Sequence, residues 1–152
     1  MFQPNTYNTE TKKACYNIKN IDTRKEAIDI MVSFFNKTIN LTNGDVIVPA
    51  PQHIGYADYT LELATKLVAG SNAIIADILK CVPHKSVCEQ KKEGIKPTIK
   101  MYLKGEIPKS KNIYFLDNVI ATGTTYNEAC KLIPGIKPLV FAIDYEVYEI
   151  NK

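Results

Sequence analysis

An acidic residue and an amide residue stand side by side at the end of one apolar run in this sequence. The run covers residues 113–116, and Asp117 and Asn118 follow it directly. The next stretch, residues 121–125, consists of small and hydroxyl-bearing residues around Gly123. Carboxylate and amide oxygens accept hydrogen bonds from sugar hydroxyls, whereas threonine hydroxyls donate to phosphate oxygens. The pattern therefore predicts a site for a sugar that carries a phosphate group.

The helix expected after this loop supplies a second part of the phosphate site. The first N–H groups of a helix have no partner within the helix and carry a partial positive charge, so they bind anions. Gly123 lets the backbone approach an anion closely, and Thr122, Thr124 and Thr125 add hydroxyl donors. Thr125 and Glu128 have the spacing of a capping box that would begin the helix. The alternative is a plain turn at a strand end, capped by short polar side chains.

The segment FLDNVIATGTT resembles the phosphoribosyl-pyrophosphate (PRPP) binding motif of type I phosphoribosyltransferases. That motif is an apolar run, two acidic residues, two apolar residues and a small loop rich in threonine and glycine. The stretch DVIVPAPQH, residues 45–53, is similar to the ComF-type branch of the family, although that branch's zinc ribbon is absent here. The resemblance spans residues 45–143. It implies an enzyme that transfers phosphoribose from PRPP to a nitrogen nucleophile, a nucleobase or an amine, and releases pyrophosphate.

The resemblance also implies roles for single residues. Asp117 and Asn118 would bind the 2′ and 3′ hydroxyls of the ribose. The loop around the 5′-phosphate would comprise Ala121, Thr122, Gly123, Thr124 and Thr125, and the loop around the pyrophosphate would comprise Ala50, Pro51, Gln52 and His53. Mg²⁺ would be the cofactor, with Asp117 as a metal ligand, directly or through a water molecule.

A charged segment between two prolines falls where the family carries a flexible loop that closes over the reaction. Residues 83–97 show neither strand nor helix periodicity, and long loops in compact domains often act as lids. Lys85, Lys91 and Lys92 are the candidate catalytic residues of this loop. The alternative for these lysines is an ordinary solvated run of charge.

Three departures from the family pattern leave catalytic turnover open. Asn118 replaces the second acid, and Asn118→Asp, which would restore the pair, is expected to be tolerated. Ala121 stands where purine-specific relatives often carry an aspartate, which argues against a hypoxanthine/guanine-type enzyme. The only arginine of the chain is Arg24. A non-catalytic module that binds PRPP or a nucleotide, and a phosphoribosyl hydrolase, are therefore alternatives. Relatives often dimerise, so the resemblance leaves a homodimer open.

Short apolar runs and stretches of helical spacing alternate along the chain. Strands are expected at 45–49, 73–79, 112–116 and 139–143, and helices at 24 to about 36–39, 56–69, 98–103 and 125–133. Thr23 and Glu26 have capping-box spacing at the first of these helices. Residues 145–150 alternate and would extend the last strand or form an edge. This order predicts an α/β fold with a mainly parallel central sheet and helices on both faces, as in phosphoribosyltransferases.

The composition places further bounds on the protein. A chain of 152 residues with 45% hydrophobic content predicts one domain over residues 1–152, with 1–13 as a loose N-terminal arm. The net charge of +3 suits a small anionic ligand better than nucleic acid. No apolar run approaches the roughly 18 residues of a membrane span, and the N-terminus lacks the apolar core of a signal peptide. These features predict a cytoplasmic protein without a membrane partner.

Three potential zinc ligands lie close together in the sequence. Cys81, His84 and Cys88 could supply three of the four ligands that structural zinc requires, but no fourth is evident nearby. The alternative is that these cysteines are ordinary thiols, which a cytoplasmic protein keeps reduced.

Overall fold

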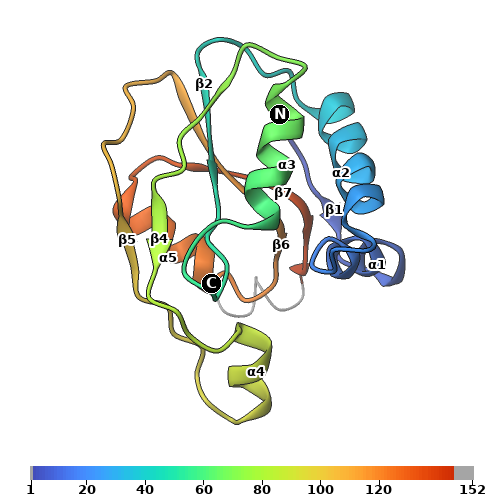
Figure 1. The fold of residues 1–152 in the computed structure, drawn as a ribbon, viewed down its shortest axis with the longest axis vertical. Coiled ribbons are helices and arrows are strands. Elements are labelled where there is room, and N and C mark those ends of the chain that lie inside the picture. Colours follow the sequence, from blue (N-terminus) through green and yellow to red (C-terminus); the bar gives the residue numbers. More distant parts are fainter. Residues whose placement is uncertain (1, 146–152) are drawn as a thin grey trace.

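A five-stranded parallel sheet forms the centre of the molecule (Figure 1). The computed structural model describes residues 2–145. The strands lie in the order β1-β7-β6-β2-β3, and every neighbouring pair is parallel. Their bounds are Asn5–Thr6 for β1, Asp45–Pro49 for β2, Ile74–Ile75 for β3, Asn112–Ile120 for β6 and Lys137–Ile143 for β7. The expected α/β fold with a mainly parallel sheet is confirmed.

The two central strands are covered on both sides, as their composition predicts. All five residues of β2 are buried, which suits an apolar run in the middle of a parallel sheet. Strand β6 is longer than the predicted 112–116, because it stays paired with β7 as far as Ile120 beside Ile143. Asp117 and Asn118 therefore lie within a strand rather than after one.

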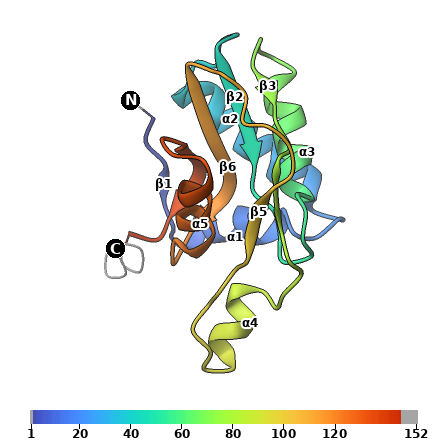
Figure 2. The ribbon, with the colours of Figure 1, turned by 90° about the vertical axis from the view of Figure 1, so that its left-hand side faces the viewer.

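Helices pack on both faces of the sheet, and Figure 2 shows α5 on the side of the sheet opposite α2 and α3. One face carries α1 (Thr9–Asn17), α2 (Arg24–Thr38) and α3 (Tyr59–Val68), and the other carries α5 (Thr124–Leu132). On the first face Phe35 and Leu63 pack in one cluster with Ile47 of the sheet. On the second face Phe115 and Ala129 belong to a separate cluster. The prediction of helices on both faces is therefore confirmed.

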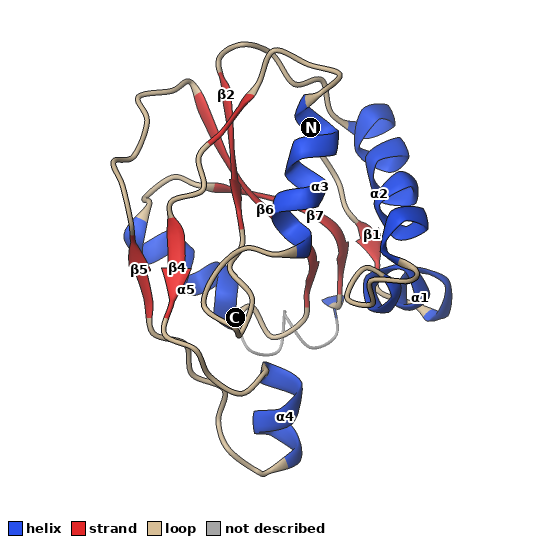
Figure 3. Ribbon diagram, in the orientation of Figure 1, coloured by secondary structure: helices blue, strands red, loops and turns tan. Residues whose placement is uncertain are grey.

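A separate two-stranded ribbon carries the segment that was expected to be a long loop (Figure 3). Strand β4 (Leu79–Cys81) pairs antiparallel with β5 (Met101–Leu103), and a short helix, α4 (Val87–Lys92), lies between them. The expected strand 73–79 is thus divided between two sheets. The expected helix at 98–103 was wrong, because Met101–Leu103 pair with β4 and cross-strand pairing outweighs local propensity.

The first residues of the chain are ordered, so the prediction of a loose arm over 1–13 was wrong for the residues described. Asn5 pairs with Ala142 at the edge of the sheet. Asn8 caps α1 by accepting from the backbone N–H of Thr11, whose hydroxyl accepts in turn from the Asn8 N–H. The strand is held by backbone hydrogen bonds, which a polar sequence does not reveal.

Helix α2 begins where expected, but without the expected capping box. The Thr23 side chain makes no cap hydrogen bond, and its hydroxyl donates instead to the Asn17 carbonyl at 2.7 Å. The alternating stretch predicted at 145–150 lies, after Tyr145, outside the described residues. Within residues 2–145, no helix has both the length and the apolar character required to cross a membrane.

Candidate functional site

Two loops leave the sheet side by side at the carboxyl ends of its central strands. In β2 and β6, Pro49 lies opposite Leu116, and the Ala50 N–H donates to the Leu116 carbonyl at 2.9 Å. The loop after β2 and the end of β6 therefore start from neighbouring positions. Ligands of open α/β sheets bind at this edge. The structure thus brings Asp117 close to the loop that begins at Ala50.

Asp117 is half-buried near the end of β6 and has an unusual protonation equilibrium. Burial raises the pKa of its carboxyl to about 7, although the hydrogen bond from the Asn118 N–H and the positive charge of Lys19 lower it in part. A carboxyl with this pKa exchanges its proton near neutral pH. Its charge state therefore depends on what binds next to it, and a nearby cation would favour the ionised form.

Two neighbours of Asp117 were not singled out from the sequence. Lys19 follows α1, and its charge acts on the Asp117 carboxyl. Tyr59 opens α3, and burial together with the charge of Asp117 raises its pKa well above the ordinary value. No sequence signal connects these residues, because the three elements that carry them meet only in the fold.

Asn118 does not join Asp117 in this site. Its side chain is buried, and its Nδ2 donates to the Cys15 carbonyl at 2.9 Å. In return the Cys15 thiol contacts the Asn118 carbonyl at 3.6 Å. Successive side chains of a strand point to opposite faces, so two adjacent residues cannot both face one ligand without a local distortion. The structure places Asn118 against α1, where it fixes the strand end to that helix.

The threonine-rich loop forms a tight turn into α5. Gly123 has a φ of 82°, in the left-handed region, and its carbonyl accepts the Asn127 N–H at 2.8 Å. The hydroxyls of Thr122 and Thr124 contact each other at 2.8 Å. These contacts are all local, and they leave a helix N-terminus with a hydroxyl pair beside it. Such an arrangement is suited to an anion.

The expected capping box at α5 was wrong. The cap residue is Gly123 rather than Thr125, and it makes no side-chain cap hydrogen bond. Glu128 instead pairs with Lys131 at 2.8 Å. The first turn of α5 contains no acidic residue, which leaves its positive end uncompensated by carboxylates of its own helix.

The loop after β2 uses its polar side chains to hold itself in place. The Gln52 Nε2 donates to the Ala50 carbonyl at 2.9 Å, and its Oε1 accepts from the Asp58 N–H at 2.5 Å and the Thr60 hydroxyl at 3.3 Å. Pro51 is buried and His53 is exposed. The Gln52 amide is thus engaged within the protein, and the loop presents the exposed His53 side chain.

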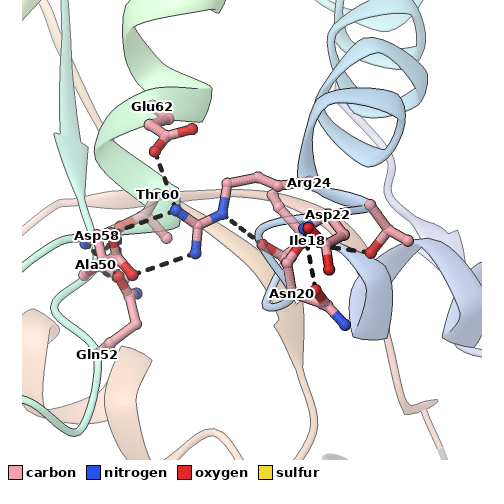
Figure 4. A network of polar contacts seen from close by, with 10 residues as sticks. Ile18, Asn20, Asp22, Arg24, Ala50, Gln52, Asp58, Thr60 and Glu62 are labelled. Carbon is pink, nitrogen blue, oxygen red and sulfur yellow. Dashed lines mark hydrogen bonds and ion pairs between the residues drawn. The ribbon is translucent and has the colours of Figure 1, made fainter.

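A buried arginine, Arg24, lies next to Asp58, which bonds to this loop, as Figure 4 shows. The Arg24 guanidinium forms ion pairs with Asp58 at 3.3 Å and with Glu62 at 3.0 Å. Its Nε donates to the Ile18 carbonyl at 2.9 Å. Asp58 and Glu62 are one helical turn apart, a spacing that places two acids on one face of a helix. Nothing in the sequence identified Arg24 as the partner of these two acids.

The candidate lysines lie on a projecting part of the molecule. Lys85 pairs with Glu93, and Lys91 and Lys92 are exposed in the last turn of α4. Helix α4 extends away from the sheet in both Figure 1 and Figure 2. The structure therefore does not bring these lysines to Asp117.

The segment that bears α4 is ordered by Gln90, which the sequence did not indicate. Gln90 is buried, its Nε2 donates to the Lys85 carbonyl at 2.8 Å, and its Oε1 accepts from the Thr98 N–H at 3.1 Å. The His84 N–H donates to the His53 carbonyl at 2.9 Å. The segment is thus anchored to the loop after β2.

The suggested zinc ligands do not form a cluster. Cys81 is buried, with its thiol 3.2 Å from the Gln52 carbonyl, whereas Cys88 is exposed on α4. Within residues 2–145, no group of three or more His, Cys, Asp or Glu side chains is placed to hold a metal ion. Cys81 serves instead as a contact between the ribbon and the loop after β2.

Comparisons with known proteins give a distant likeness. No protein-family model matches the chain, and no curated protein matches it. Adenine phosphoribosyltransferase from Leishmania donovani is similar, with a TM-score of 0.44 and 15% identity over 84% of this chain and 53% of that chain. A structure of adenine phosphoribosyl transferase from Trypanosoma brucei, in complex with AMP, pyrophosphate and ribose-5-phosphate, has a TM-score of 0.46 and 14% identity over 93% of this chain and 82% of that chain.

The chain thus spans about half the length of the Leishmania protein. The ComF-type branch expected from the sequence receives no support from either structure.

Proposed function

We propose that this protein binds PRPP and transfers its phosphoribose to a nitrogen nucleophile, a nucleobase or an amine, with release of pyrophosphate. The observation that supports this best is the order of groups along β6 and α5. A carboxyl at the strand end is followed by a left-handed glycine turn with paired threonine hydroxyls, and then by a helix N-terminus. These groups match a ribose that bears a 5′-phosphate.

Each part of the ligand has a proposed contact. Asp117 accepts hydrogen bonds from the ribose hydroxyls. The turn from Ala121 to Thr125 and the first N–H groups of α5 hold the 5′-phosphate. The loop from Ala50 to His53 receives the pyrophosphate through its backbone and His53. Asn118 enters the proposal only as the residue that fixes the strand end to α1.

Mg²⁺ fits this site only as an ion that arrives with the ligand. The end of β6 offers the Asp117 carboxyl, and within residues 2–145 no group of three or more His, Cys, Asp or Glu side chains is placed to hold a metal ion. Mg²⁺ is commonly held by one or two carboxylates together with substrate phosphates and water. When bound, it would neutralise charge on the pyrophosphate leaving group. Asp117, in its ionised form, would hold the ion through a water molecule.

The transfer itself requires mainly positioning and the exclusion of water. The bond between the sugar carbon and the pyrophosphate oxygen breaks, and a bond to the acceptor nitrogen forms. The sugar becomes cationic on the way, so water in the site would capture it. The protein's part is to orient the two ends of PRPP and to keep the reacting carbon dry.

A turnover assay tests the proposal. Incubation with PRPP, Mg²⁺ and a panel of nucleobases and amines is expected to release pyrophosphate, with Asp117→Ala as the inactive control. Release that needs no acceptor would identify a hydrolase. No release with any acceptor, together with no binding of PRPP, would refute the proposal.

A non-catalytic binding module is the second candidate, and one observation favours it. Asn118, Gln52 and Arg24 are all engaged inside the protein, so few polar groups remain to act on a leaving group. Such a module would gain thermal stability from PRPP, because a ligand of the native state raises its melting temperature. It would form no product under any condition of the assay.

A further inference from the structure

We infer that Arg24 is a positioning residue that holds the loop after β2 in the form that receives pyrophosphate. This inference rests on the proposed function. Arg24 lies at the start of α2, and its side chain bonds to Ile18, Asp58 and Glu62 rather than to the loop from Ala50 to His53. Its influence passes through Asp58 and Gln52, which join two helices to the loop (Figure 4).

The first link is between Arg24 and the start of α3. Arg24 is 7% exposed, and its guanidinium contacts both Asp58 oxygens, at 3.4 and 3.3 Å. The same guanidinium reaches Glu62 one turn further along α3, and its Nε is fixed by the Ile18 carbonyl. A planar guanidinium held by three partners fixes the direction in which the Asp58 carboxylate points.

The second link is between Asp58 and the loop. Asp58 is the cap residue of α3, yet its side chain makes no cap hydrogen bond. Its backbone N–H donates instead to Gln52 Oε1 at 2.5 Å. Gln52 Nε2 and the Thr60 hydroxyl both donate to the Ala50 carbonyl, at 2.9 and 2.6 Å. The position of Asp58 therefore fixes Gln52, and Gln52 fixes the first residues of the loop.

The charge of Arg24 keeps the Asp58 carboxylate away from the first N–H groups of α3. An aspartate at a helix N-cap normally accepts hydrogen bonds from the first backbone N–H groups of its own helix. Here the carboxylate is turned to Arg24, and Gln52 Oε1 accepts from the backbone N–H of Asp58 itself rather than from the first N–H groups of the helix. Without the guanidinium, the Asp58 side chain is free to cap α3 in the ordinary way. That cap needs an extended Asp58 backbone, whereas here φ is −110° and ψ is −91°, so we expect the Asp58 N–H to leave Gln52 and the loop to lose its fixed shape.

The test separates the two ends of the proposed ligand. Arg24→Met keeps the length of the side chain and removes its charge, and the half-exposed Asp58 and Glu62 remain in contact with water. The matched control is Lys25→Met, at the exposed neighbouring position of α2. Calorimetric titration is performed with Mg-pyrophosphate and, separately, with ribose 5-phosphate. Arg24→Met is expected to weaken pyrophosphate binding about tenfold or more and ribose 5-phosphate binding less than about twofold.

A second variant and a second measurement complete the experiment. Gln52→Met removes the second link, between Asp58 and the loop. If Arg24→Met does not fold, Gln52→Met is expected to show the same selective loss of pyrophosphate binding. Amide hydrogen exchange over residues 50–58 is expected to speed up in both variants and not in Lys25→Met. The positioning role is overturned if the Arg24→Met and unmodified proteins bind both ligands with the same affinity, or if the variant loses affinity for both ligands to the same extent. Unchanged amide exchange over residues 50–58 overturns it as well. If the unmodified protein binds neither ligand, the proposed function fails together with the pyrophosphate role, and exchange still decides whether Arg24 fixes the loop.

Discussion

The two loops at the carboxyl edge of the sheet are held in different ways. The turn after β6 is held by contacts among its own residues, with Thr122 bonded to Thr124 and Asn127 bonded to Gly123. The loop after β2 is held by its own Gln52 and, through Asp58, also by Arg24, which lies 34 positions from Asp58 in the sequence. One loop thus forms from local sequence, and the other depends on how α2 and α3 pack.

This difference bears on what each loop can tolerate. A self-contained turn keeps its shape if its glycine and hydroxyls are kept, whatever happens elsewhere in the molecule. A loop held by a series of contacts, such as Arg24 to Asp58 and Asp58 to Gln52, loses its shape when any residue in the series changes. We therefore expect substitutions near β6 to act on the site directly and substitutions at a distance to act on the loop after β2. The following predictions test the β6 side, from the largest expected effect to the smallest.

Asn118→Asp is expected to destabilise the protein by about 2–4 kcal/mol at about pH 8. The change replaces a buried donor to the Cys15 carbonyl by a carboxylate that faces it. The loss should be smaller at about pH 5, where a protonated carboxyl can donate the missing hydrogen bond. This reverses the expectation from the motif alone, in which the substitution restores a family pattern.

Urea unfolding at the two pH values measures this effect. Asn20→Asp is the control, because Asn20 is exposed and already acts as an acceptor, from the Asp22 N–H. Equal stability of Asn118→Asp and the unmodified protein at about pH 8 would show that Asn118 does not need its amide, and that the site has room for a second acid.

Asp117→Ala is expected to weaken ribose 5-phosphate binding by about 10- to 100-fold. It removes a charge-assisted acceptor for a sugar hydroxyl, a contact worth roughly 1.5–3 kcal/mol. Calorimetric titration gives the affinity, and Asp29→Ala on the exposed face of α2 is the control. If the affinity of Asp117→Ala is unchanged, the sugar binds elsewhere and the β6 turn is only structural.

The contribution of Asp117 to the stability of the protein is expected to fall as pH rises from about 4 to about 7. Burial raises the pKa of Asp117 from 3.8 to about 7, so the folded state keeps a proton that the unfolded chain has lost. The stabilisation is complete below the unfolded pKa and is lost as pH passes through the folded pKa. Asp117→Asn removes this dependence and is expected to be more stable by about 2 kcal/mol at about pH 8.

Urea unfolding of both proteins across this pH range measures the effect. Subtraction of the two curves isolates Asp117 from every other titrating group. Parallel curves would mean that the carboxyl is ionised at an ordinary pH in the folded protein.

Gly123→Ala is expected to cost about 1–2 kcal/mol, because alanine is strained at a φ of 82°. Ribose 5-phosphate affinity should fall as well, since the turn cannot keep its shape. The control is Gly70→Ala, at a position without positive φ and with no atom within 4 Å of the added methyl group. If both variants are equally stable, the turn is not held by its glycine.

Much of the fold followed from short-range patterns. Strand β2, helix α2 and strand β7 were predicted because apolar residues recur there at strand or helix spacing. The pairing of β1 with β7, and the β4–β5 ribbon, were missed because hydrogen bonds between distant backbones leave little trace in composition. The strand bounds of β6 were missed for the same reason, since its last residues are strand only because β7 continues beside them.

The sequence by itself determined the turn from Ala121 to Thr125, because a glycine in the left-handed region and hydroxyls two residues apart act over a few bonds. It also indicated that Asp117 lies near the carboxyl end of a central strand, although β6 continues past it to Ile120. Only the tertiary structure decided that Asn118 faces Cys15, that Gln52 accepts from the Asp58 N–H, and that Arg24 pairs with two acids at the start of α3. Asn118 and Arg24 bind partners that lie more than 30 positions away in the chain. Gln52 binds the residue that begins α3, so its role depends on where that helix packs. The roles of all three side chains therefore depend on which surfaces pack together.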